Sequence, residues 1–271
     1  MKDNKIVLGI VGSPNPKGLT NQLVTSALKG AADAGVATEL IQLSEYVVAA
    51  CKDCLPWVCA ENLKCTYEDK AFEFVSQKIL NCGALILGTP VYWWDTTGLV
   101  KYLILKMFRV YARSGVFHGL PAFGLSIAGG TGNGLISGLR PVYHFFQMMQ
   151  MRALEPVPAT RFNFNEALTR AGELGGRIAA MTDSRKPFNG LEERLIWYDN
   201  LPFLGLSRAQ ERRLLADIVA LKVAEEVGAD VLSGLARSDS FSAAGRSVDA
   251  LSEVTKVYEA GVKAFESNKP K

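Results

Sequence analysis

Four of the five cysteines in this 271-residue chain lie close together, between positions 51 and 65, and the fifth stands apart. The clustered residues are Cys51, Cys54, Cys59 and Cys65, with the spacing C-x2-C-x4-C-x5-C. In a reducing compartment such a cluster indicates metal or redox chemistry more often than disulfides. The chain has only two histidines, so imidazole-based metal sites are nearly excluded. Cys82, at the start of an apolar run, is interpreted as a small core residue.

A polar turn follows the first apolar run of the chain. Positions 12–21 read Gly-Ser-Pro-Asn-Pro-Lys-Gly-Leu-Thr-Asn, and the apolar periodicity after them predicts a helix over 19–34. A helix N-terminus offers unpaired N–H groups and the positive end of its dipole, and Ser13, Thr20 and Asn21 add side-chain donors. This combination suits a phosphate, although a merely polar turn with a helix cap is the alternative. It is not a P-loop, because the Gly-Lys-Ser/Thr ending is missing.

Two further loops could contact a flat ligand. Tyr92, Trp93 and Trp94 follow Pro90 directly, and such rings could form the wall of a site for a ring system. The alternative is aromatic core packing, but three consecutive aromatic residues in an extended segment cannot all enter one core. At least one is therefore expected to be exposed. The glycine-rich loop at 128–134 would let the backbone approach the same ligand closely.

The elements that must position these loops alternate along the chain. Apolar runs predict strands at 5–12, 37–43, 84–88, 122–127 and 155–162, and periodic segments predict helices at 19–34, 67–80, 98–111, 136–151 and 165–181. This alternation is typical of a parallel sheet with helices on both faces. We expect a flavodoxin-like five-stranded sheet in the order 2-1-3-4-5. The loops after strands one, three and four would then meet at one switch point.

The remainder of the chain, 182–271, differs in character and is expected to be a helical C-terminal extension to a domain at 1–181, which carries the cysteine-rich insertion at 51–65. Ser207 and Gln210 form a capping box for a long helix that carries Leu214, Ile218, Leu221 and Val231. A serine-rich break at 238–247 and a last helix at about 248–265 follow. Such helices pack on the parent domain or on a partner subunit, and both options stay open.

Composition limits the class of protein. With 48% hydrophobic and 21% charged residues and a net charge of +3, the chain reads as an ordinary globular protein without the basic patch that nucleic acid or an anionic membrane would require. No apolar stretch reaches 18 residues, and the N-terminus does not resemble a signal peptide. We therefore expect a cytoplasmic protein that binds neither nucleic acid nor membranes.

Taken together, the three loops resemble those of the NADPH-dependent FMN reductase branch of the flavodoxin-like superfamily, especially its iron-sulfur flavoproteins, over about residues 4 to 181. The segment Thr89-Pro90-Val91-Tyr92 after an apolar strand carries this resemblance most specifically. The resemblance implies that the first loop binds the FMN phosphate and that the other two loops hold the isoalloxazine ring. The implied phosphate ligands are Ser13, Asn15, Thr20 and Asn21, and the implied ring contacts are Thr89, Pro90, Val91, Tyr92, Trp93, Trp94, Ala128, Gly129 and Gly130.

The chain departs from the family at three places. Many relatives have Arg where Asn15 stands, and many have Asp-Arg where Leu105-Lys106 stands. Iron-sulfur flavoproteins carry a compact cysteine motif in the position of the four clustered cysteines, which would make Cys51, Cys54, Cys59 and Cys65 the ligands of a 4Fe-4S cluster. Here the second and third cysteines are further apart than in the family pattern. A zinc ion or a vestigial, empty motif are the alternatives, and zinc is disfavoured because two-residue knuckles on both sides are absent.

The resemblance implies an FMN-dependent oxidoreductase that takes a hydride from NAD(P)H at flavin N5 and passes electrons to a small-molecule or protein acceptor, in some cases through the cluster. No side chain need act as a catalytic acid or base. The alternatives are an FMN electron-transfer protein that does not turn over nicotinamide, and a cluster-free quinone, nitro-compound or ene reductase. Relatives also imply a homodimer or homotetramer.

Overall fold

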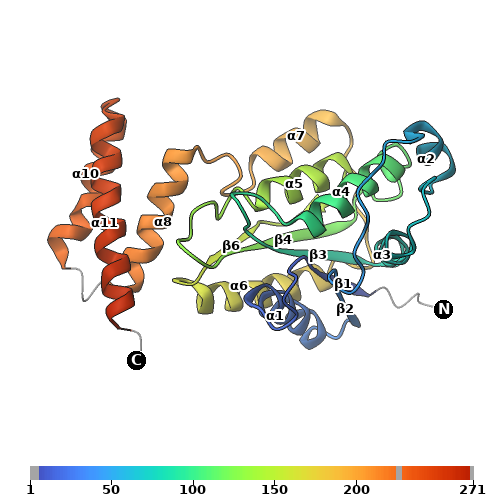
Figure 1. The fold of residues 1–271 in the computed structure, drawn as a ribbon, viewed down its shortest axis with the longest axis horizontal. Coiled ribbons are helices and arrows are strands. Elements are labelled where there is room, and N and C mark those ends of the chain that lie inside the picture. The colour runs from blue at the N-terminus through green and yellow to red at the C-terminus, as the bar shows by residue number, and fades with distance from the viewer. Residues whose placement is uncertain (1–5, 224–227, 269–271) are drawn as a thin grey trace.

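The computed structural model describes residues 6–223 and 228–268, and its centre is a parallel sheet (Figure 1). The sheet is ordered β2-β1-β3-β4-β5, and β6 also pairs with β4. Its strands are β1 (Val7–Val11), β2 (Thr38–Gln42), β3 (Ala84–Pro90), β4 (Pro121–Ala128), β5 (Arg152–Ala153) and β6 (Val157–Thr160). In register, Val7 lies opposite Thr38 on one side and Ala84 on the other. The predicted flavodoxin-like order is confirmed.

The fifth strand differs from its prediction. Instead of one strand at 155–162, two short strands pair with successive parts of β4, and the chain leaves the ladder between them. Pro156 has no N–H for a ladder hydrogen bond, and the carboxylate of Glu155 turns outward to bind Arg170 and Arg177. This local chemistry divides the strand in two.

Helices cover both faces of the sheet (Figure 1). Helices α1 (Leu19–Asp33) and α6 (Phe164–Ala179) pack on one face, and α3 (Lys70–Asn81), α4 (Gly98–Tyr111) and α5 (Leu139–Met148) pack on the other. The contact between α1 and α6 is close because Gly175 has no side chain, since a Cβ there would lie 1.8 Å from the carbonyl oxygen of Ala27. Two hydrophobic clusters, one on each face, enclose strands that are apolar on both sides.

Around the cysteines the helices depart from the predicted boundaries. A short helix, α2 (Pro56–Asn62), was not predicted and begins with proline in its first turn. The helix predicted at 67–80 begins at Lys70. Asp69 is its N-cap and accepts a hydrogen bond from the backbone N–H of Phe72, so the predicted start at position 67 was wrong.

The C-terminal extension is helical, as predicted, but its helices divide differently. It contains α7 (Leu191–Asp199), which was not predicted, α8 (Arg208–Lys222), α10 (Ala229–Ala243) and α11 (Ser247–Ser267). The capping box of Ser207 and Gln210 opens α8 as expected. Val231 lies on α10 and not on the helix that carries Leu214, and positions 224–227 are outside the described residues. Most of the predicted serine-rich break is helical, because α10 continues to Ala243.

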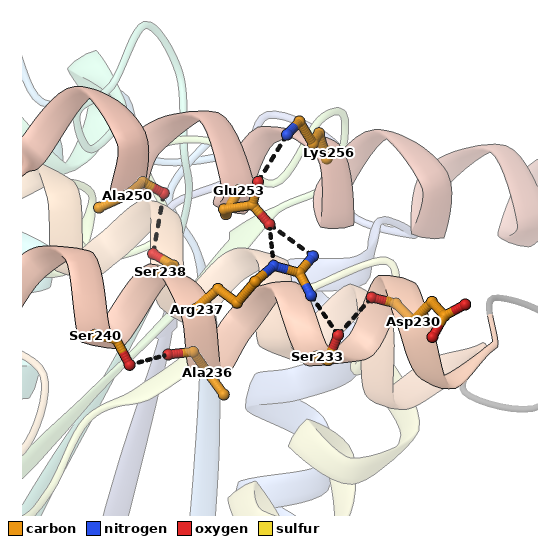
Figure 2. Close-up of polar contacts among 9 residues, drawn as sticks. All are labelled: Asp230, Ser233, Ala236, Arg237, Ser238, Ser240, Ala250, Glu253 and Lys256. Carbon is orange, nitrogen blue, oxygen red and sulfur yellow. Dashed lines mark hydrogen bonds and ion pairs between the residues drawn. The ribbon is translucent and has the colours of Figure 1, made fainter.

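Helices α10 and α11 form a hairpin held by a polar network (Figure 2). The carboxylate of Glu253 accepts from Arg237 Nε at 2.7 Å and from Lys256 Nζ at 2.7 Å. Ser238 Oγ, inside the segment predicted as a break, donates to the carbonyl oxygen of Ala250 at 3.0 Å. Ser238 therefore joins the two helices, and Ser240 Oγ donates to the carbonyl oxygen of Ala236 within α10 at 3.0 Å.

The extension packs back on the sheet domain. The hydroxyl of Tyr258 on α11 donates to the carbonyl oxygen of Thr131 at 2.7 Å, and Phe265 packs edge-on against Phe162 with ring centroids 4.9 Å apart. Leu215 of α8 lies against Gly132. Of the two options left open by the sequence, the structure shows contact with the parent domain, at its glycine-rich loop. Among the described residues, no helix has both the length and the apolar character needed to cross a membrane.

Candidate functional site

The three loops singled out in the sequence lie together at the carboxyl ends of β1, β3 and β4. The N–H of Gly12 donates to the carbonyl oxygen of Gly88 at 2.7 Å, and Thr97 Oγ1 donates to the carbonyl oxygen of Gly12 at 2.7 Å. A Cβ on Gly129 would lie 4.0 Å from Leu19, the first residue of α1. The loops after strands one, three and four therefore form one contiguous site, as the strand order requires.

In the first loop, side chains satisfy the turn and leave the helix end open. Ser13 Oγ accepts from the N–H of Asn15 at 3.1 Å, and Asn15 Oδ1 accepts from the N–H of Lys17 at 3.0 Å. Helix α1 follows Gly18, without a side-chain cap and without an acidic residue in its first turn. Its first N–H groups are thus available to an anion at the positive end of the helix dipole.

The other two residues implied for phosphate binding differ in burial. Thr20 is buried in the first turn of α1, and a Cβ on Gly88 would lie 3.2 Å from its Cγ2. Asn21 is partly exposed and its Oδ1 accepts from Thr25 Oγ1 at 3.2 Å. Of the four, Ser13 and Asn15 shape the loop, while Thr20 faces the sheet.

Gln42, at the carboxyl end of β2, was not anticipated. Its Nε2 donates to the carbonyl oxygen of Ser13 and lies 3.1 Å from Ser44 Oγ, so it holds the first loop against the sheet. Its Oε1 is buried without a hydrogen-bond partner among the described residues. The sequence signal that could have identified Gln42 is its amide side chain near the end of the strand predicted at 37–43.

The aromatic loop forms a tight turn with strained residues at its tip. Tyr92 and Asp95 exchange backbone hydrogen bonds of 2.9 and 3.1 Å, and between them Trp93 and Trp94 have φ angles of 56° and 58°. Two successive positive φ values are the signature of a type I′ turn, which normally contains Asn and Gly. Each left-handed non-glycine residue costs about 1–2 kcal/mol, and such strain concentrates at functional sites.

The rings of this turn point away from the core. Trp93 is 90% exposed, Trp94 57% and Tyr92 51%. The two indoles meet edge-to-face with centroids 6.0 Å apart. The alternative of aromatic core packing is thereby excluded, and the expectation that at least one ring is exposed is confirmed.

Thr89, implied as a ring contact, is fully buried beneath the turn. Its hydroxyl lies 2.6 Å from Thr96 Oγ1 and accepts from the N–H of Thr97 at 3.3 Å. Thr97 in turn caps α4. The structure places Thr89 where it supports the turn from inside.

A cavity of about 190 Å³ lies between the aromatic turn and the glycine-rich loop. It brings together Val91, Trp93, Trp94, Ala128, Gly129 and Gly130 from the implied ring contacts. Gly134 closes the loop with a φ of 81°, and a Cβ there would lie 3.0 Å from Trp94 Cδ1 and 3.2 Å from Trp94 Cα. Only glycine permits this approach of the loop to the turn.

The four clustered cysteines all line a second, small cavity of about 10 Å³ between the cysteine loop and α4. Thr66 Oγ1 lies 3.0 Å from Cys54 Sγ and 3.5 Å from Cys59 Sγ. The hydrogen bond with Thr66 lowers the pKa of the Cys54 thiol, whereas burial raises that of Cys65. Across the described residues, no three Cys, His, Asp or Glu side chains are grouped as metal ligands.

The other wall of the cysteine cavity is cationic. Lys106 and Arg109 of α4 line it, and a terminal guanidinium nitrogen of Arg109 lies 3.1 Å from Oδ1 of Asp53, which lines the cavity as well. Arg109 Nε is buried with no hydrogen-bond partner among the described residues. Lys106 is 1% exposed and pairs with Asp69, which also caps α3. Burial raises the pKa of Asp69, but hydrogen bonds from Lys106 and from the N–H groups of Phe72 and Ala49 outweigh it, so this pKa lies below its usual value.

Four thiols on one cavity suit an iron-sulfur cluster in donor type, although Asp53 and Asp69 already pair with the two cations. The present volume is too small for one, so the thiols would have to move apart. Cys82 is buried in the core, where its Sγ donates to the carbonyl oxygen of Ile79 at 3.2 Å and burial raises its pKa to about 12. This agrees with its interpretation as a core residue.

Sequence comparison with known proteins assigns the chain to a family. The model of the family described as NADPH-dependent FMN reductase matches residues 6–161. An iron-sulfur flavoprotein of Methanocaldococcus jannaschii is 37% identical over 98 residues, which are 36% of this chain and 49% of that protein. This chain therefore spans about half the length of that relative.

Solved structures share the fold. A flavone reductase superposes with a TM-score of 0.50 at 16% identity, covering 68% of this chain and 66% of that chain. A flavoenzyme NAD(P)H:(acceptor) oxidoreductase from Paracoccus denitrificans also gives 0.50, at 15% identity, covering 67% and 98%. At these identities the likeness establishes the flavodoxin-like fold alone.

Proposed function

Because the chain belongs to the NADPH-dependent FMN reductase family, a family of flavin oxidoreductases, we propose that it binds FMN between its three loops and transfers electrons from NAD(P)H to a second acceptor. The observation that carries the proposal is the cavity between the strained aromatic turn and the glycine-rich loop, beside the open N-terminus of α1. A ring placed in that cavity and a phosphate at the helix end would belong to one FMN molecule.

The protein's own contribution is binding and orientation. The N–H groups of the first turn of α1 would hold the phosphate, with charge compensation from the helix end and from Lys17, because Asn15 carries no charge. The backbone at Gly129 and Gly130 can approach the ring, since both are exposed and nothing crowds Gly130. When bound, FMN supplies the redox chemistry, accepting hydride from NAD(P)H and passing electrons on.

We call the cavity between the aromatic turn and the glycine-rich loop the flavin cavity, and the side chains lining it are apolar, hydroxyl or amide groups. The proposed reaction therefore needs no acid or base from the lining residues. Trp93 and Trp94 would instead exclude water from the ring and provide an aromatic surface for the nicotinamide or for an aromatic acceptor.

A turnover assay distinguishes the proposed enzyme from an FMN protein that only carries electrons. FMN-loaded protein is mixed with NADPH or NADH and a quinone, and oxidation of the nucleotide is followed at 340 nm. We expect catalytic oxidation that depends on both FMN and acceptor. Bound FMN without turnover of either nucleotide would favour the carrier, and absence of FMN binding would exclude both.

We also propose that Cys51, Cys54, Cys59 and Cys65 hold a 4Fe-4S cluster, supported by their convergence on one cavity with Lys106 and Arg109. The test is iron and acid-labile sulfide in anaerobically purified protein. We expect about four iron atoms per chain, lost in Cys54→Ser and retained in Cys82→Ala. Less than one iron per chain with flavin bound would assign the motif to zinc or to structure and leave a cluster-free reductase.

The physiological acceptor is proposed to be a small molecule or a redox protein, and the assembly a homodimer or homotetramer. Light scattering of the FMN-loaded protein at working concentration tests the assembly. A monomer would remove it from the proposal.

A further inference from the structure

A third cavity, of about 400 Å³, adjoins the flavin cavity and shares Trp94 and Asn133 with it. Its opposite wall comes from the C-terminal extension, through Arg208 and Arg212 at the start of α8, and Arg140 of α5 completes it. Residues 208 and 212 lie outside the segment that matches the family model. We call this space the arginine cavity.

Among the residues that the structure describes, the charges of Arg208 and Arg212 have no partners. Both side chains are exposed, and within the described residues neither forms a hydrogen bond or an ion pair. They lie four residues apart on one face of α8, where two like charges repel each other. They also lie in the first turns of the helix, whose positive dipole end disfavours cations. An anion between them would remove both penalties.

The remaining charged groups of the arginine cavity are already engaged. Arg140 donates to the carbonyl oxygens of Leu204, at 3.3 Å, and Leu206, so its position is fixed by the segment before α8. Glu211 is the one carboxylate lining the cavity within the described chain, and it is buried, with Oε1 accepting from the N–H of Ile136 at 3.2 Å. Three guanidinium groups thus line the cavity, and the one carboxylate among its described lining residues already accepts a hydrogen bond from a backbone N–H.

We propose that the arginine cavity binds the anionic group of the molecule that exchanges electrons with the flavin. The proposal rests on the proposed function, because it places that molecule against Trp94 with its charge toward α8. A cavity of this size admits a phosphate, sulfonate or carboxylate together with part of its carrier. The anion could be the 2′-phosphate of NADPH or a charged group on the acceptor, and Arg208 and Arg212 would bind either in the same way.

The test compares charged and neutral members of two ligand pairs on FMN-loaded protein. Calorimetry measures the dissociation constants of NADP⁺ and NAD⁺, and of 1,4-naphthoquinone-2-sulfonate and 1,4-naphthoquinone, so that no turnover is needed. The variants are Arg208→Gln, Arg212→Gln and their double variant. Arg113→Gln is the matched control, because Arg113 is exposed, lines none of these cavities and has no ion pair among the described residues.

We expect the charged member of one pair to bind about tenfold to hundredfold more tightly than its neutral partner, the range for hydrogen bonds to charged groups. The double variant should abolish this preference and Arg113→Gln should keep it. The pair that shows the preference identifies the source of the anion. Equal affinities in both pairs, or a preference that survives in the double variant, would overturn the proposal.

A separate arm distinguishes this failure from failure of the proposed function. Inorganic pyrophosphate is titrated into protein without FMN, in which the arginine cavity is still present. Binding that is lost in the double variant supports the arginine cavity even if no flavin binds. Because the open N-terminus of α1 can also take pyrophosphate when FMN is absent, the quantity compared is the binding that wild type shows beyond the double variant. If wild type shows no such additional binding, the arginine cavity is refuted, whatever the flavin does.

Discussion

Replacing Trp93 with asparagine should separate the stability of the aromatic turn from its function. Trp93 adopts a left-handed backbone conformation at a φ of 56°, which costs a bulky residue about 1–2 kcal/mol and suits asparagine better. Its ring is 90% exposed, so little burial is lost. The edge-to-face contact with Trp94 contributes about 0.5–1.5 kcal/mol in the opposite direction. The free energy of unfolding should therefore stay within about 1 kcal/mol of wild type.

Binding should respond differently. Stacking of an aromatic side chain on a flat heterocycle is typically worth about 1–3 kcal/mol, so Trp93→Asn should raise the dissociation constant of FMN, or the KM for NAD(P)H, about 5- to 150-fold. Fluorescence titration measures the first, steady-state kinetics the second, and urea denaturation the stability. Trp93→Tyr keeps a ring on the same backbone and should change each constant only a few-fold.

Two results would contradict the proposed role of the Trp93 ring. A loss of more than about 2 kcal/mol of stability in Trp93→Asn would mean that the ring holds the turn together. Unchanged affinity for FMN and unchanged KM for both nucleotides would mean that the exposed ring does not contact the bound molecules.

Other substitutions test residues that support the flavin cavity and the cysteine cavity. Gly134→Ala should destabilise the protein by more than about 1 kcal/mol and weaken FMN binding, because the φ of Gly134 is 81° and the new Cβ would meet Trp94. In the control Gly130→Ala the new Cβ meets no atom within 4 Å, so stability should stay unchanged. Equal stability of the two variants in urea denaturation would contradict this expectation. Asp69→Asn should cost about 3–5 kcal/mol at pH 7, since it leaves the buried charge of Lys106 unpaired, while Asp33→Asn on the surface should cost less than about 1 kcal/mol. Because the pKa of Asp69 is lowered by folding, its contribution is present above about pH 4 and is lost as the pH falls below that, so the difference between wild type and Asp69→Asn should shrink in acid. A difference that stays constant from pH 7 to pH 3 would show that this carboxylate does not titrate with folding.

The sheet and its loops could be predicted from the sequence because their signals are local. Each central strand is a short apolar run that ends at glycine or proline, and the strand order then brings the three loops together. The exposure of at least one ring of the aromatic loop also followed from sequence, because three consecutive aromatic residues cannot share one core. The left-handed backbone of the turn could not be predicted, because tryptophan disfavours it and the contacts of Thr89 with Thr96 and of Gly134 with Trp94 join residues that no sequence motif relates.

Other elements depend on contacts that the sequence does not show. Helix α7 is short and is held by tertiary hydrogen bonds from Trp197 Nε1 to the carbonyl oxygen of Ala153, at 2.8 Å, and from Tyr198 to that of Met151, at 2.7 Å. The arginine cavity requires Arg140 and Arg208, from distant parts of the chain, to face each other across α5 and α8. Neither arrangement has a periodic or spaced motif from which it could be recognised.

An anaerobic titration shows whether this chain positions FMN for reduction by a nicotinamide nucleotide. Protein loaded with FMN and freed of excess flavin is mixed with one equivalent of NADPH or NADH, and flavin absorbance near 450 nm is recorded. We expect about one FMN bound per chain and its bleaching by an equivalent of at least one of the two nucleotides. Bound flavin that stays oxidised with both nucleotides, or a protein that retains no FMN, would contradict it.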